Sequence, residues 1–199
     1  MSPGPAATAG LTSGPTSGPA SDSTPEEAGA NPLAGMVGIA PATLIDLIDT
    51  LRDRDESVAT AESLTAGLVC AVLTSVPGAS AVVRGGLAVY ASDLKSALAG
   101  VDAGLLAAHG AVHPDVAGQL ARGARDTCAA RWGIGLTGVA GPSPQDGVEP
   151  GTVHVAVAGP DSSGTISAEV RTVSASGDRH EIRCVAVRAA INLLVERVG

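Results

Sequence analysis

The sequence has no phenylalanine, one tryptophan (Trp132), one tyrosine (Tyr90) and a single lysine (Lys95) in 199 residues. Aromatic residues make up 1% of the chain, although hydrophobic residues as a whole make up 45%. The core must therefore be built from alanine, valine, leucine and isoleucine, which pack closely where helices cover a sheet. This length and composition favour one compact α/β domain.

Basic residues are also scarce, with 12 Lys and Arg against 20 Asp and Glu and a formal net charge of −8. Non-specific nucleic-acid binding needs a basic surface, so we expect no nucleic-acid partner. A ligand with one phosphate group is still compatible with this balance, because a few arginines or a helix N-terminus can bind it.

No stretch approaches the roughly 20 apolar residues of a membrane span, and the N-terminus lacks the basic start of a secretory signal. We therefore expect a cytoplasmic protein without membrane contact. Three widely spaced cysteines, Cys70, Cys128 and Cys184, form neither a disulfide framework nor a metal-type pair. Buried, reduced thiols are expected.

Residues 1–41 contain seven of the 13 prolines and no basic residue. Such a Pro-, Gly- and Ser-rich segment buries too little apolar surface to offset its ordering entropy. We predict a disordered N-terminal tail over 1–41 and a folded domain over 42–199.

Within the domain, hydrophobic periodicity and Gly/Pro positions predict alternating strands and helices. Strands are expected at 57–62, 82–90 and 133–137, with a hairpin formed by 152–158 and 165–173. Helices are expected from Thr43, at 65–76, 93–98, 103–109 and 114–130, and at the C-terminus, with Thr43 and Ser176 as caps. This order predicts a three-layer α/β/α domain with a mixed, mostly parallel sheet.

Two motifs match dehydrogenase signatures but lack the required context. Gly133-Ile-Gly-Leu-Thr-Gly138 fits G-x-G-x-x-G, yet the predicted strand runs through its first glycines and no helix is expected after it. Tyr90 and Lys95 lie five residues apart, whereas the Tyr and Lys of short-chain dehydrogenases lie four apart on one helix. Neither motif predicts a nicotinamide cofactor site.

The segment Ala61-Glu-Ser-Leu-Thr-Ala-Gly67 is more informative, because a strand is predicted to end there and a helix to begin. Ser63 falls in the connecting turn, at the carboxyl end of the strand, where open α/β sheets bind ligands. The first helix amides would suit an anion or an oxyanion. Ser63 is either a nucleophile or a simple N-cap, and its position alone does not decide.

Lys95 adds a second reactive group, since the other 11 basic residues are arginines. A desolvated lysine can lose its proton and act as a base, which arginine cannot do. Together with Ser63 it indicates a serine–lysine hydrolase; the alternative is a solvated Lys95 beside a packed Tyr90.

Six ordered blocks within 43–197 carry a family resemblance. They are Thr60-Ala-Glu-Ser-Leu-Thr-Ala-Gly67, Gly86-Leu-Ala-Val-Tyr-Ala-Ser-Asp-Leu-Lys95, His109-Gly-Ala-Val112, Leu136-Thr-Gly-Val-Ala-Gly-Pro142, Gly151-Thr-Val153 and Gly177-Asp-Arg179. Together they resemble the CinA C-terminal domain family, which includes stand-alone nicotinamide-nucleotide amidases. The family's cysteine after the serine is Leu64 here, and its second glycine is Ala66. Only the low-complexity segment precedes the domain, so the stand-alone form is expected.

The resemblance implies catalytic roles for Ser63, Lys95, Tyr90 and Thr137. Ser63 would attack the carboxamide of nicotinamide mononucleotide, and Lys95, neutral because it is desolvated, would take its proton. Thr137, Tyr90 or turn amides would stabilise the oxyanion. The implied products are ammonia and nicotinate mononucleotide, as in pyridine-nucleotide salvage. No cofactor and no metal are required, and a homodimer or larger homo-oligomer is implied.

The candidate substrate-binding residues are Glu62, Thr65, Gly67, Gly138, Ala140, Gly141, Arg179 and Arg183. Arg179 and Arg183 lie one helical turn apart and either bind the phosphate or form an exposed helix face. Glu62 would orient Lys95, contact ribose or pair with an arginine. The four histidines, His109, His113, His154 and His180, are too scattered to predict a metal site.

The sequence is also compatible with two other functions. One is a non-catalytic nucleotide-binding or partner-binding module that keeps the pocket but not the chemistry. The other is an amidase acting on a different substrate. Binding alone does not require a unique lysine, which favours an enzyme.

Overall fold

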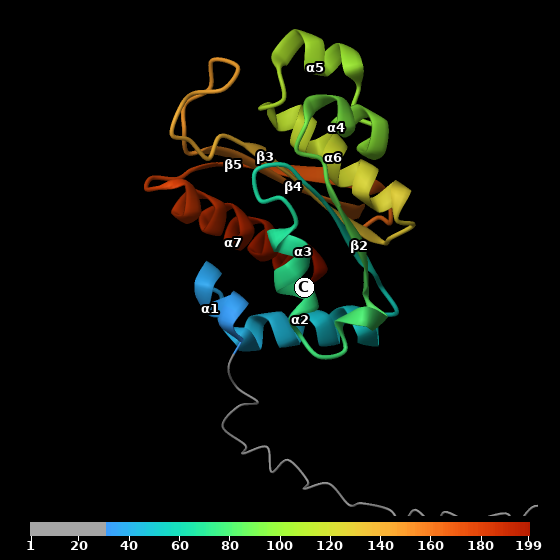
Figure 1. The fold of residues 1–199 in the computed structure, drawn as a ribbon. Coiled ribbons are helices and arrows are strands. Elements are labelled where there is room, and N and C mark those ends of the chain that lie inside the picture. Colours follow the sequence, from blue (N-terminus) through green and yellow to red (C-terminus); the bar gives the residue numbers. More distant parts are fainter. Residues whose placement is uncertain (1–30) are drawn as a thin grey trace, which may run out of the picture. The chain divides into compact units, whose positions relative to one another are not determined.

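The computed structural model describes residues 31–199, and the predicted tail up to residue 30 lies outside them. A five-stranded sheet with the order β2-β1-β3-β4-β5 runs through the centre (Figure 1). The strands are β1 (Val58–Glu62), β2 (Val83–Ala88), β3 (Trp132–Gly138), β4 (Thr152–Pro160) and β5 (Ile166–Ser174). The first three pair in parallel, and β4 is antiparallel to both its neighbours. The predicted mixed, mostly parallel sheet and its C-terminal hairpin are confirmed.

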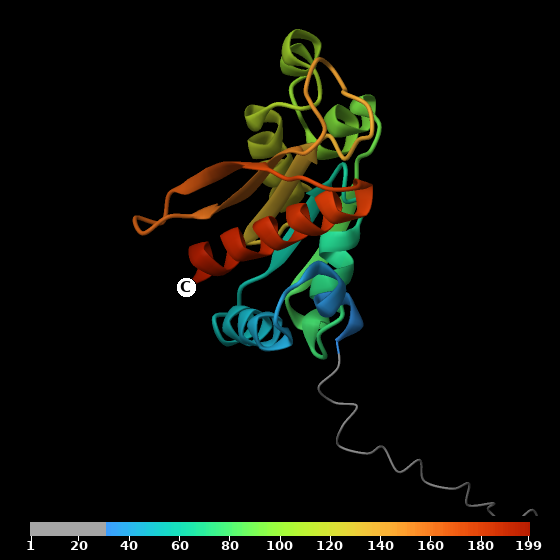
Figure 2. The same ribbon diagram turned by 90° about the vertical axis from the view of Figure 1, so that its left-hand side faces the viewer.

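Helices cover both faces of the sheet, which confirms the three layers. On one face lie α1 (Pro32–Val37), α2 (Pro41–Asp53), α3 (Leu68–Thr74) and α7 (Arg179–Val198). On the other lie α4 (Ser92–Ala99), α5 (Ala103–His109) and α6 (Pro114–Thr127). Figure 2 shows α7 running along its face of the sheet. A short 3₁₀ turn, η2 (Ala79–Ala81), precedes β2.

The glycines of the G-x-G-x-x-G match have a packing role. A Cβ on Gly133 would lie 2.0 Å from the carbonyl oxygen of Ala121, and one on Gly135 would lie 2.3 Å from that of Ala117. Both carbonyls belong to α6, so the two glycines let this helix approach β3 closely. The whole match lies inside β3, and no helix follows it. The motif therefore serves helix–sheet packing.

The folded part begins earlier than predicted. Residues 32–37 form α1, which is capped by the Asn31 side chain and ends at Gly38 in the left-handed region. Ala34 and Val37 are fully buried against the main core. The segment contains Pro32 and Gly35, but its few apolar side chains bury enough surface to order it. The domain boundary at 41 was therefore placed too late.

Both predicted caps are also wrong. Helix α2 starts at Pro41, whose fixed φ suits the first helical position, so Thr43 lies inside the helix. Helix α7 is capped by Asp178 in a capping box with Glu181, two residues beyond Ser176. In residues 31–199, no helix is both long and apolar enough to cross a bilayer.

Candidate active site

The turn after β1 is organised by the fully buried carboxylate of Glu62. One oxygen accepts hydrogen bonds from the amides of Gly67 and Val69, both at 3.0 Å, and the other from the amide of Cys70 at 2.9 Å. The hydroxyl of Thr60 also donates to it at 2.9 Å. Glu62 thus satisfies the N-terminal amides of α3. Those amides are therefore not free for an anion, and the partners of the Glu62 carboxylate are these groups, with no hydrogen bond or ion pair to Lys95 or to an arginine in residues 31–199.

The same turn presents Ser63 at the carboxyl end of β1. Its amide donates to Leu136 O at 3.2 Å, and its hydroxyl has no hydrogen-bond partner within residues 31–199. Ala66 has a φ of 52°, a left-handed conformation that costs a non-glycine residue on the order of 1 kcal/mol. The turn delays the start of α3 to Leu68, three residues later than predicted. Ser63 is therefore held by backbone geometry while its hydroxyl stays free.

Lys95 is 1% exposed, on the buried side of α4. Its ammonium donates to Val89 O at 3.0 Å and to Tyr90 O at 3.1 Å. Burial lowers the pKa of Lys95, while the negative charges of Asp146 and Asp93 act in the opposite direction. The prediction of a desolvated lysine agrees with this position, and the alternative of a solvated Lys95 is wrong.

A short backbone path connects Lys95 with Ser63. The residue that accepts the first Lys95 hydrogen bond, Val89, donates its own amide to Glu62 O at 2.9 Å. Glu62 immediately precedes Ser63 and pairs with Ala88 in the parallel ladder of β1 and β2. The two reactive groups therefore follow neighbouring strand ends, although no hydrogen bond joins them in the structure.

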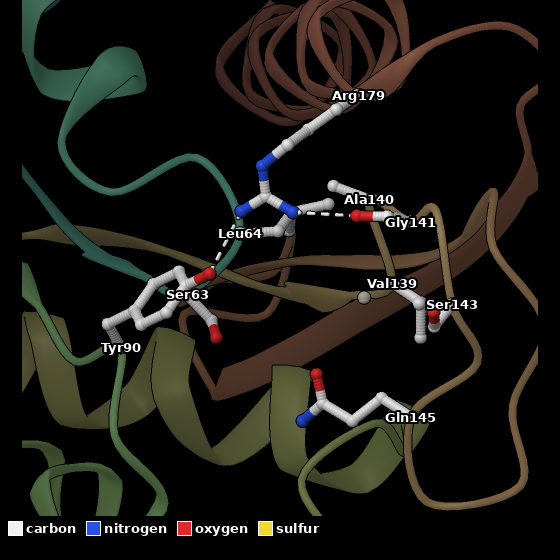
Figure 3. Close-up of a pocket in the computed structure, with 10 residues that line it drawn as sticks. Ser63, Leu64, Tyr90, Val139, Ala140, Gly141, Ser143, Gln145 and Arg179 are labelled. Atoms are coloured by element: carbon white, nitrogen blue, oxygen red, sulfur yellow. Dashed lines mark hydrogen bonds between the residues drawn. The ribbon is translucent and has the colours of Figure 1, made fainter.

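A cavity of about 140 Å³ opens at these strand ends (Figure 3). It is lined by Ser63, Leu64, Tyr90, Gly138, Val139, Ala140, Gly141, Ser143, Gln145 and Arg179. The Arg179 guanidinium spans its rim, donating to Gly141 O and to the Tyr90 hydroxyl, both at 2.9 Å. The Tyr90 side chain is otherwise exposed, so the predicted alternative of a packed Tyr90 is wrong. The site thus combines a free hydroxyl, a fixed arginine and an exposed ring.

Comparison with known proteins identifies the family of this chain. A model of the CinA C-terminal domain matches residues 42–198. A CinA-like protein from Frankia casuarinae is 45% identical over 162 residues, covering 81% of this chain and 36% of that protein. One from Anaeromyxobacter sp. (strain K) is 48% identical over 149 residues, covering 74% and 35%. The chain belongs to the CinA C-terminal domain family. It spans about a third of the length of these curated relatives.

Solved structures of CinA proteins share this fold. The competence/damage inducible protein CihA from Agrobacterium tumefaciens is 31% identical with a TM-score of 0.72, covering 79% of this chain and 94% of that chain. A CinA superfamily protein from Enterobacter cloacae is 26% identical with a TM-score of 0.71, covering 94% and 100%. The resemblance stated from the six sequence blocks is confirmed.

Several residues that the sequence assigned to the site of this CinA domain have other partners. The buried hydroxyl of Thr137 donates to Ala111 O at 2.7 Å, so its hydrogen is not available to an oxyanion. Arg183 donates to Thr65 O at 3.0 Å, and neither residue lines the cavity. Gly67, with a φ of 97°, ends the turn. None of these four residues lines the cavity in the structure.

The CinA domain also places residues at the cavity that the sequence did not single out. Ser143 and Gln145 line it from the loop between β3 and β4, and Leu64 and Val139 complete the wall. The only sequence signal was the Gly/Pro-rich character of that loop. The departure from the family pattern at Leu64 therefore changes the cavity wall, whereas the one at Ala66 changes only the turn.

The histidines of this CinA domain do not form a metal centre. His154 is buried on β4 and hydrogen-bonds Thr172 at 2.9 Å. Burial lowers the pKa of His154, with a smaller effect of the same sign from His113. Within residues 31–199, no group of three or more His, Cys, Asp or Glu side chains is arranged to hold a metal ion.

Proposed function

We propose that this domain hydrolyses the carboxamide of nicotinamide mononucleotide, with Ser63 as nucleophile and Lys95 as general base. The observation that carries the proposal is a free serine hydroxyl at the end of β1, together with a buried α4 lysine of lowered pKa whose ammonium binds the backbone that follows β2. A lysine that is neutral at working pH can accept a proton, as activation of serine requires.

In the proposed reaction Ser63 acts from the cavity wall, and Lys95 acts from beside Tyr90, a lining residue whose carbonyl oxygen it binds. Lys95 takes the proton of the Ser63 hydroxyl as its oxygen bonds to the carboxamide carbon. Leu64, Ala140 and Gly141 line the cavity, and their amides have no hydrogen-bond partner within residues 31–199, so we assign them as the donors for the oxyanion. The protonated Lys95 returns the proton to the leaving nitrogen, ammonia departs, and water hydrolyses the ester on Ser63.

Arg179 and Tyr90 give the substrate its orientation. The guanidinium is fixed by two acceptors but keeps further N–H groups for a phosphate. The exposed Tyr90 ring offers a flat apolar surface beside it. The product of this reaction, nicotinate mononucleotide, belongs to pyridine-nucleotide salvage. The family resemblance supports this pathway, a cytoplasmic location and a homodimer or larger homo-oligomer.

The direct test is ammonia release from nicotinamide mononucleotide by the full chain and by a Ser63→Ala variant. We expect turnover by the parent protein and loss of at least about 10³-fold in the variant, because the nucleophile is absent. Calorimetric binding of the nucleotide without turnover by the parent would instead establish a nucleotide-binding module. Turnover of another carboxamide alone would establish a related amidase.

The pH dependence of this activity provides a second prediction. Asp146 raises the pKa of Lys95 against the effect of burial, so Asp146→Asn lowers that pKa further. Since the base acts in its neutral form, activity rises as pH passes the Lys95 pKa, and the acid limb of kcat/KM moves to lower pH in the variant. Asparagine keeps an oxygen for the Ala111 amide that Asp146 binds at 3.1 Å.

The matched control is Asp53→Asn, which removes an exposed carboxylate at the end of α2. Its acid limb is expected at the parental pH. A limb of Asp146→Asn that stays in place or moves to higher pH would contradict the assignment of Lys95 as the base.

A further inference from the structure

The polar groups that face the cavity fall into two sets. Arg179 and the Tyr90 hydroxyl bind each other. The side chains of Ser63, Ser143 and Gln145 make no hydrogen bond within residues 31–199, although all three line the cavity. Figure 3 shows the Gln145 side chain extending from its loop into the space that it shares with Ser63. Gln145 is the only one of the three that offers both a donor and an acceptor on a planar amide.

The loop holds Gln145 in a defined place. Gln145 and Val148 exchange two backbone hydrogen bonds, of 3.0 Å and 2.9 Å. Asp146 and Gly147 between them have φ values of 53° and 75°, as a type I′ hairpin turn requires. The Asp146 carboxylate also accepts the Ala111 amide at 3.1 Å, which ties the turn to the segment after α5. Gln145 therefore stands on a short, anchored hairpin that positions its side chain before a ligand arrives.

We propose that Gln145 is the specificity-determining residue for the carboxamide, an inference that rests on the proposed function. Its Nε2 donates to the carbonyl oxygen of the substrate while its Oε1 accepts from the amide nitrogen. The carboxylate product has only acceptors, so Oε1 faces a charged oxygen and one of the two hydrogen bonds is lost. Gln145 thus binds the substrate in preference to the product and favours product release.

The test measures equilibrium binding of both nucleotides to the full chain carrying Ser63→Ala, so that neither ligand is turned over. Calorimetry gives dissociation constants for nicotinamide mononucleotide and nicotinate mononucleotide, with Gln145 retained, with Gln145→Leu and with Gln145→Glu. The two nucleotides share their phosphate and ribose, so the ratio of their constants isolates the carboxamide. Leucine keeps the approximate size without hydrogen bonds, and glutamate keeps the size with acceptors only.

The two substitutions are expected to move this ratio in opposite directions. Gln145→Leu weakens substrate binding about tenfold and product binding clearly less, which reduces discrimination. Gln145→Glu weakens product binding about tenfold or more, because two carboxylates meet, and weakens substrate binding less. A residue that only supports the loop would change both constants together and leave the ratio at the parental value, which would overturn the proposal.

The outcome separates this inference from the proposed function. The ratio of the two dissociation constants could shift in both variants while the parent protein releases no ammonia. This result would support Gln145 as the residue that recognises the carboxamide and would reject the amidase. An unchanged ratio with an active parent would reject Gln145 alone. Absence of binding of both nucleotides would reject both.

Discussion

Replacing Lys95 with methionine reduces amide hydrolysis by about 10³-fold or more and leaves the domain folded. The side chain is 1% exposed, and methionine fills a similar unbranched volume without a titratable group. Removing the base leaves the Ser63 hydroxyl protonated at the moment of attack, so the effect falls on kcat. Ammonia release with saturating nicotinamide mononucleotide measures it.

A Lys95→Arg variant separates base catalysis from simple charge. Arginine keeps the positive charge but does not lose its proton, so the proposal requires it to be as inactive as the methionine variant. Activity of Lys95→Arg near the parental level would mean that Lys95 acts only through its charge. Circular dichroism and thermal unfolding of both variants establish whether any loss reflects unfolding.

The Lys95→Met substitution also changes how the free energy of unfolding depends on pH. The pKa of Lys95 is lowered in the folded chain, so between that pKa and the ordinary value of 10.5 the unfolded chain binds more protons. Stability therefore rises with pH in this window, and this rise is absent in Lys95→Met. Urea unfolding at several pH values detects the difference without reference to any substrate.

Regular periodicity allowed most of the sheet and its helices to be predicted. The strand predicted over 133–137, for example, matches β3 closely, because its apolar residues and its glycines fit a buried strand under a helix. Helix α1 was not predicted, because its few apolar residues are stabilised by contacts with α2, α3 and α7. Local composition does not contain such tertiary contacts.

The site residues also differ in how far the sequence predicts their roles. The positions of Ser63 and Lys95 follow from strand ends and from a unique residue, both visible in the sequence. The partners of Glu62 and Thr137 do not, because a buried polar side chain beside a turn can bind either the ligand or the backbone. Both side chains bind the backbone: Glu62 accepts from the α3 amides, besides the Thr60 hydroxyl, and Thr137 donates to Ala111 O. Gln145 was missed because its role depends on how a loop folds over the cavity.

Replacing Glu62 with glutamine is expected to lower the free energy of unfolding by about 2–4 kcal/mol. Glutamine has the same shape, but its NH₂ group replaces one carboxylate oxygen. In the parent protein that oxygen accepts hydrogen bonds from backbone amides, so in the variant two donors face each other. The substitution removes a buried negative charge from the start of α3 and leaves donors without a partner. Urea denaturation at neutral pH measures the change.

Glu149→Gln supplies the matched control, because Glu149 is exposed and its side chain makes no hydrogen bond within residues 31–199. Its effect is expected within about 0.5 kcal/mol. Since Glu62 directly precedes Ser63 and fixes the turn that carries it, the Glu62 variant should also lose activity under conditions where it remains folded. A Glu62→Gln protein as stable as the control would show that the α3 amides find other partners, and that the turn holding Ser63 does not depend on this carboxylate.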